Sequence, residues 1–409
     1  MSVHSVQFGS ADRSYLCKTT GRTIPQLSNG ESMKKIAYCA AGVVLLGAFL
    51  NSVSAAGPGA NVSKEGQRLF ETETFGGNGR TCRTCHSADT GTISPADAAK
   101  RLRKNPADPL FVHDGSDDGL GKGVSRILRD ATVLVTIPLP ANVVLADDPA
   151  ARTVVLRRGV ATTLNTPALD PVLMLDGRQP TLESQANGAI HDHAQGVAPS
   201  PTELHAIADF QRTNAFFSST ALRQLASGGP LPGLPLGETA AEQRGRRFFE
   251  DVPPDPTDGF KPGLCAHCHS GPLLNQTNQF AEAFIGLPIP AGARFSNVLV
   301  AEFNAAQNPL REFVFNPGPG EVRFWSPDPG RALITGSVDN STLGNVNAFK
   351  ISALRGVRRT APYFHDNSAK SLEDVAAHYA TFFNVVTGGF IVLTPQDQKD
   401  LVAYMKLLD

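Results

Sequence analysis

Two short motifs of cysteine and histidine carry the clearest chemistry in this sequence. Residues 82–86 read CRTCH and residues 265–269 read CAHCH, so both follow the pattern C-x-x-C-H. Thiols at this spacing can add to the two vinyl groups of one haem, and the next histidine points its imidazole at the iron. The sequence therefore predicts two covalently bound haems c. Their expected attachment residues are Cys82, Cys85 and His86 for the first haem, and Cys265, Cys268 and His269 for the second.

Two other kinds of site use closely spaced thiols. Zinc could be bound by the four cysteines, but the two pairs lie far apart in the sequence and each has its own histidine. A thioredoxin-like redox pair would need a βαβ context, which the surrounding pattern lacks. Haem attachment is therefore the interpretation that fits both motifs.

The sixth ligand of each iron decides what a haem can do. An iron with two protein ligands transfers electrons, whereas an iron with one open side can bind peroxide or dioxygen. Beyond residue 55 the chain has two methionines, Met174 and Met405. Met405 falls on the apolar face of an expected final helix, where packing in the core is its more frequent role.

The N-terminal region predicts export. Residues 33–55 combine two lysines after Met33, an apolar run and a small-residue VSA sequence, as in a secretory signal peptide. We expect residues 1–32 to precede the true translation start. The expected location is the periplasm, with no stable membrane span because the apolar run is short.

Charge excludes some partners. The 409 residues include 37 Lys and Arg against 38 Asp and Glu, so the formal net charge is -1. Neither a nucleic-acid-binding surface nor a polybasic membrane anchor fits this balance.

The elements that must position the two motifs recur in two halves. A Pro/Gly-rich stretch, residues 227–237, predicts a boundary between domains 56–228 and 229–409. Each half should begin with a helix that carries a glycine and a phenylalanine, over residues 63–70 and 239–249. Each should end with a capped amphipathic helix, after Ser200 and after Thr394. We expect a mainly α fold of two tandem cytochrome c-type domains, one per haem, in which the long segments 251–263 and 308–340 form loops or short hairpins.

Three further stretches resemble the bacterial di-haem cytochrome c peroxidases and the related MauG-type enzymes. They are residues 171–178 (PVLMLDGR) with 181–186 (TLESQA), residues 349–355 (FKISALR) with 360–366 (TAPYFHD), and residues 371–379 (SLEDVAAHY). The similarity extends from the first haem motif to the C-terminus, and residues 360–366 are its most specific part.

The resemblance implies different roles for the two haems. It assigns the first haem to peroxide, with Glu183 as the acid that handles protons on its open side and Arg178 as a partner for a haem propionate. A carboxyl with a raised pKa would suit this task. An acid in the first turn of a helix also complements the helix dipole, which is the alternative role for Glu183. The resemblance further implies a calcium ion bound by the carbonyls of Thr360 and Pro362.

For the second haem, the resemblance implies an electron store whose far-side ligand is Tyr379. A phenolate favours ferric and higher oxidation states, which points to the MauG-like branch. Packing of an interfacial tyrosine is the alternative. His378 could replace Tyr379 as ligand, but neighbouring helix positions point about 100° apart, so we expect one of the two to face the iron.

The sequence also departs from the family pattern. Leu175 stands where the family has a tryptophan before Asp-Gly-Arg, and Trp325 is the one tryptophan in the chain. His113, His191 and His193 could each close the sixth position of the first haem, or they could be exposed polar residues that leave this position open. His365 could donate a hydrogen bond to a propionate or to the protein.

Together these observations predict a periplasmic di-haem oxidoreductase that reduces hydrogen peroxide at the first haem. Its expected partners are a small electron-donor protein, either a cytochrome or a cupredoxin, or a protein substrate. Two alternatives stay open: a non-catalytic di-haem electron-transfer cytochrome, and an oxygenase that acts on an apolar substrate.

Overall fold

The computed structural model describes residues 60–285, 289–338 and 345–408. The chain divides into two units, Met1–Ala55 and Ala56–Asp409, and all described residues belong to the second. The predicted signal peptide and the segment before it lie outside the described residues. No described helix has the length and apolar character that crossing a membrane requires.

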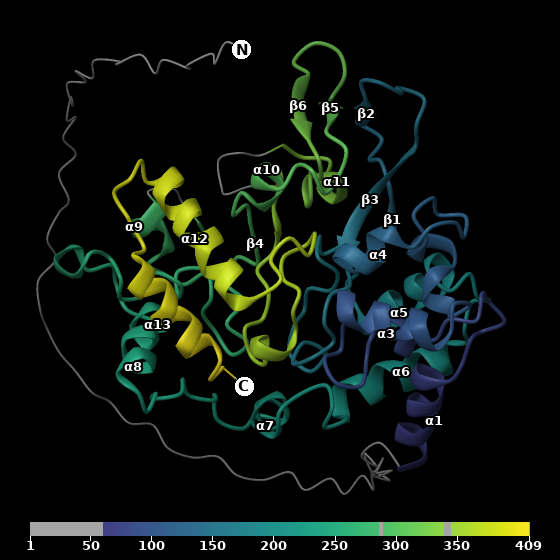
Figure 1. The fold of residues 1–409 in the computed structure, drawn as a ribbon, viewed down its shortest axis with the longest axis horizontal. Coiled ribbons are helices and arrows are strands. Elements are labelled where there is room, and N and C mark those ends of the chain that lie inside the picture. The colour runs from purple at the N-terminus through teal and green to yellow at the C-terminus, as the bar shows by residue number, and fades with distance from the viewer. Residues whose placement is uncertain (1–59, 286–288, 339–344, 409) are drawn as a thin grey trace, which may run out of the picture. The chain divides into compact units, whose positions relative to one another are not determined.

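The first half of the described chain is built around a crossing of two helices (Figure 1). Helix α1 (Ala60–Glu71) packs against α6 (Pro201–Thr213), which begins at the predicted capping box of Ser200 and Glu203. A Cβ on Gly66 would lie 2.1 Å from the carbonyl oxygen of Ala206, so only glycine permits this close approach. The other helices of this half are α2 (Cys82–Cys85), α3 (Pro95–Lys104), α4 (Ser125–Asp130), α5 (Leu182–Asp192) and α7 (Thr220–Ala226).

The second half repeats the arrangement. Helix α8 (Ala240–Arg246) packs against α13 (Pro395–Met405), and a Cβ on Gly245 would lie 2.1 Å from the carbonyl oxygen of Asp400. The predicted helix over residues 239–249 ends early, because a 3₁₀ turn follows at Arg247–Phe249. The remaining helices are α9 (Ala281–Ile285), α10 (Val300–Phe303), α11 (Ala332–Thr335) and α12 (Leu372–Val386).

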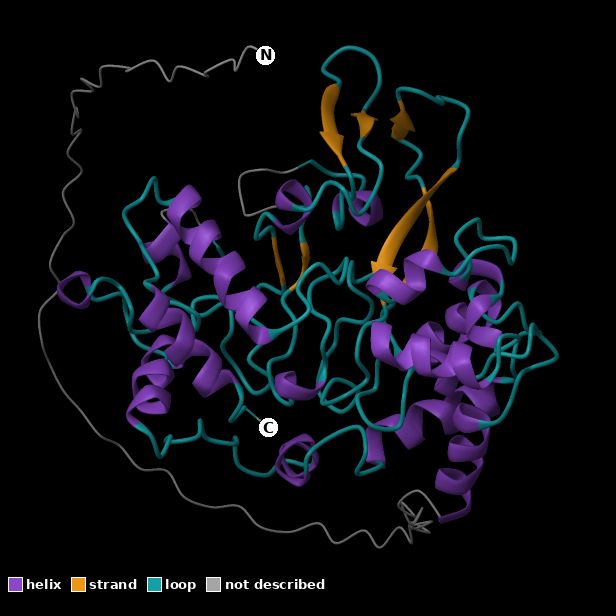
Figure 2. Cartoon of the chain, in the orientation of Figure 1, coloured by secondary structure: helices purple, strands orange, loops and turns teal. Residues whose placement is uncertain are grey.

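Strands form a larger part of the fold than the hairpins expected from the sequence (Figure 2). Strands β1 (Thr132–Pro138) and β3 (Thr153–Gly159) pair antiparallel over their full length. A second sheet has the order β2-β5-β6, from Val143–Leu145, Arg311–Phe315 and Val322–Ser326, and a third pairs β4 (Phe295–Ser296) with β7 (Phe349–Lys350). The fold is therefore mixed. The expectation of a mainly α fold is incomplete, because it left out these strands.

The long segments follow the prediction. Residues 251–263 contain one 3₁₀ turn, Pro256–Asp258, and the described part of residues 308–340 contains the hairpin of β5 and β6. Strand β2 comes from the first half of the chain and pairs with β5 from the second. The proposed boundary at residues 227–237 runs without helix or strand, and the division into two domains stays a prediction.

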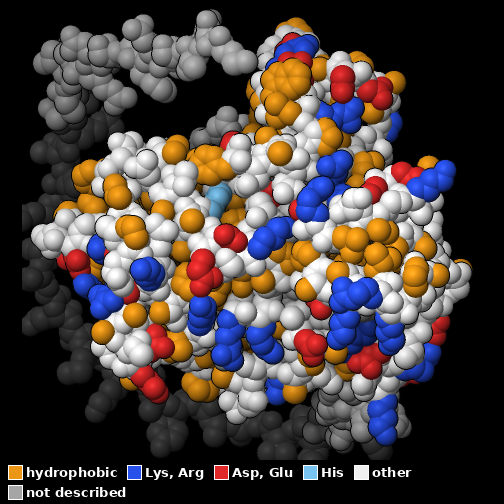
Figure 3. Space-filling view, in the orientation of Figure 1, with side chains coloured by type: hydrophobic (Ala, Val, Ile, Leu, Met, Phe, Trp, Pro, Cys, Tyr) orange, Lys and Arg blue, Asp and Glu red, His pale blue; other side chains and the backbone are white. Residues whose placement is uncertain are grey.

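On the face in Figure 3, basic and acidic side chains alternate with apolar ones, as expected from the nearly balanced charge.

Candidate functional site

The first C-x-x-C-H motif opens on a cavity in the first half of the chain. Helix α2 is a single turn, and Cys82, Cys85 and His86 all line the cavity beside it. The thiols of Cys82 and Cys85 are free, and burial raises the pKa of Cys82 to about 12. Both cysteines are available for the thioether bonds that haem attachment requires.

The second motif opens on its own cavity. Cys265, Cys268 and His269 line it, and burial raises the pKa of Cys268 to about 12. Met405 also lines this cavity and belongs to the apolar core around it. The expectation that Met405 packs in the core is in agreement with this position.

The two axial histidines are held in the same way. The Nδ1 atom of His86 lies 2.8 Å from the carbonyl oxygen of Gly91, and Nδ1 of His269 lies 2.9 Å from that of Leu274. A carbonyl can only accept, so Nδ1 is the protonated nitrogen and Nε2 keeps its lone pair for a metal. Burial lowers the pKa of His86 to about 4 and lowers that of His269, so both rings are neutral. A hydrogen bond that fixes the tautomer is the usual support of a histidine ligand. The residues present therefore fit a covalently attached haem in each cavity.

Tyr379 lies on the second cavity, on helix α12. Its side chain lines the cavity, burial raises its pKa, and Cys265 and Cys268 act on it electrostatically. The neighbouring His378 is turned away, and its Nε2 lies 2.8 Å from the carbonyl oxygen of Val298. Of this pair, Tyr379 is the side chain that could reach a metal in the cavity.

Glu183 does not line the first cavity, although it lies on helix α5 beside residues that do. Its two carboxylate oxygens accept hydrogen bonds of 3.1 and 3.2 Å from Arg212, and His205 is 3.7 Å away. Burial would raise the pKa of Glu183, but the hydrogen bonds and charge of Arg212, the backbone N–H of Glu183 and the nearby His205 together outweigh burial and lower the pKa. The expected rise in pKa is therefore wrong.

Arg178 lines the first cavity and forms an ion pair with Asp176 at 2.8 Å. Asp176 also pairs with Arg158, a buried arginine that sequence reasoning missed and that in turn binds Asp328 at 2.8 Å. Arg158 follows another arginine in strand β3, where the sequence pattern gives no sign of a buried position. This network fixes the Asp-Gly-Arg segment at the cavity wall.

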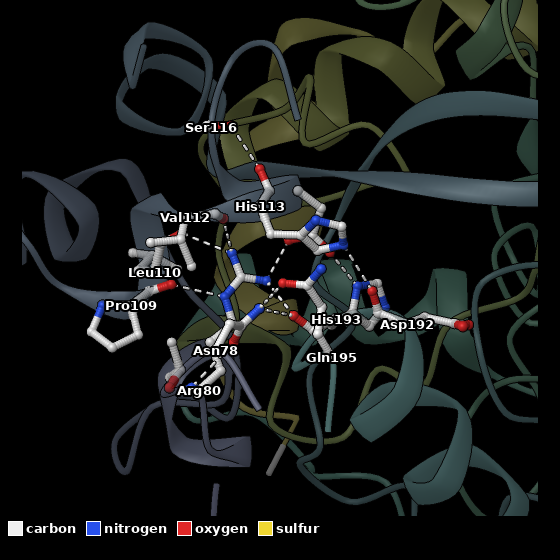
Figure 4. A network of polar contacts seen from close by, with 12 residues as sticks. Asn78, Arg80, Pro109, Leu110, Val112, His113, Ser116, Asp192, His193 and Gln195 are labelled. Carbon is white, nitrogen blue, oxygen red and sulfur yellow. Dashed lines mark hydrogen bonds and ion pairs between the residues drawn. The ribbon is translucent and has the colours of Figure 1, made fainter. Parts of the chain in front are cut away.

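The three candidate histidines lie in different places. His191 is 80% exposed, and Nε2 of His113 lies 3.1 Å from the carbonyl oxygen of Asp192 (Figure 4). His193 is the one of the three that lines the first cavity, and its Nδ1 donates to Asp114. Met174 lines this cavity as well. His365 lines the second cavity and stacks on Phe349, with the two ring centroids 3.6 Å apart.

The two cavities share part of their lining. Leu175 and Lys350 are common to both, as are residues 159–162 and Thr166. The side chain at the position expected to hold a tryptophan is therefore a leucine between the cavities. Trp325 is 61% exposed on strand β6.

The two residues of the calcium prediction would bind through their main-chain carbonyls. Thr360 and Pro362 line the second cavity, and the Thr360 hydroxyl donates to the carbonyl of Val357 at 3.1 Å. Within the described ranges, no three His, Cys, Asp or Glu side chains are grouped as a metal site.

Comparison with known proteins gives remote relatives. No family model matches the chain. Cytochrome-c peroxidase IdrP1 of Denitromonas iodatirespirans is 25% identical over 154 residues, which are 35% of this chain and 36% of the relative. The match thus spans about a third of that protein's length. It supports the family resemblance predicted from the motifs.

Two solved structures are similar over most of their length. A MauG-like protein associated with microbial copper homeostasis is 19% identical, with a TM-score of 0.46 over 85% of this chain and 88% of that one. The diheme peroxidase BthA from Burkholderia thailandensis E264 is 16% identical, with a TM-score of 0.44 over 86% of both chains.

Proposed function

We propose that this chain, which resembles the bacterial di-haem cytochrome c peroxidase and MauG-type family, is a periplasmic di-haem oxidoreductase. In this proposal hydrogen peroxide is used at the first cavity, and electrons arrive through the second. A small cytochrome or cupredoxin, or a protein substrate, supplies them.

One observation supports the proposal above all. The chain forms the same set of haem-binding groups twice. Each set has two thiols and a histidine that line a cavity, and Nδ1 of the histidine is hydrogen-bonded to the backbone carbonyl five residues later. This leaves an Nε2 lone pair for an iron in each cavity. When bound, a haem there would supply an iron that reacts with peroxide or exchanges electrons.

The two cavities differ in what lies beyond the histidine. The second presents Tyr379, whose phenol oxygen makes no hydrogen bond with the described residues and could close the sixth position. The first presents His193, Gln185 and Arg178, which are polar groups that can orient a small oxygen-containing ligand. This asymmetry favours chemistry at the first cavity and electron storage at the second.

Spectroscopy of the holoprotein tests the proposal. The chain is produced with its haem-attachment machinery, and its denatured mass is measured to count covalent haems. We expect two haems in the wild type and one in the double variant Cys82→Ser/Cys85→Ser. The resting ferric spectrum should contain a high-spin component, and peroxide should convert it to a more oxidised species.

Two results would contradict the proposal. Two low-spin haems that do not react with peroxide would indicate an electron-transfer cytochrome. Oxygen consumption with a hydrocarbon substrate, and no peroxide reaction, would indicate an oxygenase.

A further inference from the structure

A buried carboxylate and a histidine meet at the first cavity. Asp114 is 5% exposed, accepts a hydrogen bond from Nδ1 of His193 and forms an ion pair with Arg80. Arg80 is 2% exposed, and it also donates to the carbonyls of Leu110 and Val112, at 3.1 and 2.6 Å (Figure 4). The backbone around Asp114 thus fixes the arginine, and the arginine fixes the carboxylate.

Asp114 is negatively charged in this arrangement. Burial would raise the pKa of its carboxyl, but the hydrogen bond from His193 and the charge of Arg80 outweigh burial and lower the pKa. An anionic carboxylate can only accept, so Nδ1 of His193 carries a proton, and in the neutral ring Nε2 is the nitrogen with the lone pair. That Nε2 makes no hydrogen bond with a described residue, and the ring lines the cavity together with His86.

We propose that His193 is the residue that moves the proton during peroxide use at the first cavity, with Asp114 as its positioning residue. This inference rests on the proposed function and names the group that performs its proton transfer. Nε2 would accept a proton from one peroxide oxygen and return it to the other, which leaves as water, so His193 gains and releases one proton and ends in its starting protonation state. A bound haem would supply the two electrons that the breaking O–O bond takes up.

Other candidates for this role are already engaged. Glu183 is ion-paired with Arg212 and does not line the cavity. Glu73 does line it, but its carboxylate accepts a hydrogen bond of 2.6 Å from Arg68. His193 has a carboxylate behind one nitrogen and the cavity in front of the other, which is the arrangement of a general acid–base.

The charges around His193 come from several elements. Arg80, just before helix α2, and Asp114, in the 3₁₀ turn His113–Gly115, touch it, and His191 and Asp192 precede it at the end of α5. The other titratable groups beside it or on the cavity wall are His113, His86, Glu73, Arg158, Arg178 and Lys350.

The test compares four variants of the holoprotein in rapid mixing with peroxide and, separately, with cyanide. Hydrogen cyanide must lose its proton to bind ferric haem, so its association rate reports the base without any turnover. We expect His193→Gln to slow the peroxide reaction about 100-fold or more and to remove one ionisation from the pH profile of cyanide association. Its resting spectrum should stay that of the wild type. Asp114→Asn should keep that ionisation and move it to lower pH, because the imidazolium loses its counter-charge.

His191→Gln is the matched control and should react at the wild-type rate, because this histidine lies close to His193 in the chain and is exposed. Glu183→Gln tests the rival acid. The proposal is overturned if His193→Gln reacts normally, or if Glu183→Gln loses as much as His193→Gln. It is also overturned if His193→Gln turns a low-spin first haem into a high-spin one and reacts faster, since His193 would then be an iron ligand. A wild type that binds cyanide but ignores peroxide would contradict the proposed function, while cyanide association alone still decides the role of His193.

Discussion

At the scale of single residues, the two C-x-x-C-H motifs hold their histidines in the same way, but the cavity walls opposite these histidines differ. His86 and His269 have the same hydrogen bond to a carbonyl, so any difference between haems bound there must come from the opposite wall of each cavity. His193 faces the first cavity and Tyr379 the second. The ligand set that the resemblance implied is therefore best tested at the second haem, where one side chain stands out.

Replacing Tyr379 should change the second haem alone. We expect Tyr379→Met to replace a phenolate by a thioether and raise the reduction potential of that haem, because a thioether stabilises ferrous iron and a phenolate stabilises ferric iron. Potentiometric titration followed by visible and magnetic circular dichroism spectra measures both effects. His378→Gln is the control, because that ring is bonded to the carbonyl of Val298. An unchanged second haem in Tyr379→Met would make the ligand assignment wrong.

The buried carboxylate of Asp176 should make stability depend on pH. Burial would raise the pKa of Asp176, but Arg158 and Arg178 outweigh burial and lower it. A lowered pKa in the folded state means that this stabilisation is complete above the unfolded value of about 3.9. It is lost as the pH falls from there through the folded pKa. Asp176→Asn should lower the free energy of unfolding at neutral pH by about 3 kcal/mol, since it leaves Arg158 with one partner fewer in the interior.

Guanidinium denaturation of the holoprotein between pH 7 and pH 2, followed by circular dichroism, measures this loss. The variant should have a lower free energy of unfolding than the wild type at neutral pH, and this difference should disappear towards pH 2. Asp147 is the control, because its ion pair with Arg311 is exposed. Asp147→Asn should cost about 0.5 kcal/mol or less. A difference in the free energy of unfolding that stays constant with pH would contradict the assigned role of Asp176.

At the scale of elements, the two helix crossings depend on a missing side chain. Gly245→Ala would place a Cβ 2.1 Å from the carbonyl oxygen of Asp400, so α8 and α13 would have to separate. We expect a loss of about 1–3 kcal/mol, as for other overpacked contacts. Gly233→Ala meets nothing within 4 Å and should leave stability the same or slightly higher. Thermal unfolding of the two variants measures the difference, and equal midpoints would argue against a close crossing.

The elements found from sequence were those with local signals. The capping boxes at Ser200 and Thr394 give a side-chain pattern that can be read within four residues, and helices α6 and α13 begin there. Strands β1 and β3 were not predicted although Val133, Val135 and Ile137 alternate, because Leu134 extends them into a short apolar run whose periodicity does not separate a strand from a helix. Glu183 shows a second limit: its partner Arg212 lies on another helix, and no local pattern gives that contact.

At the scale of the whole described chain, several buried contacts join the two halves. Arg158 of the first half binds Asp328 of the second, and the side-chain nitrogen of Asn367 donates to the carbonyls of Asp130 and Ala131. Strand β2 of the first half also pairs with strand β5 of the second. Each of these groups would be left buried without a partner, or exposed, if the halves came apart.

The proposed boundary at residues 227–237 can therefore be tested by cutting the chain there. Because Arg158 has its second carboxylate partner in the other half, we expect fragment 56–228 alone to be unstable and fragment 229–409 alone to lack its β2 partner. Produced together, the fragments should associate through these contacts and regain the far-ultraviolet circular dichroism of the intact protein. The intact protein should unfold in one calorimetric transition, since breaking either half exposes the buried ion pair of the other. Two separate transitions, together with two stable fragments, would show that each haem motif sits in a domain that folds on its own.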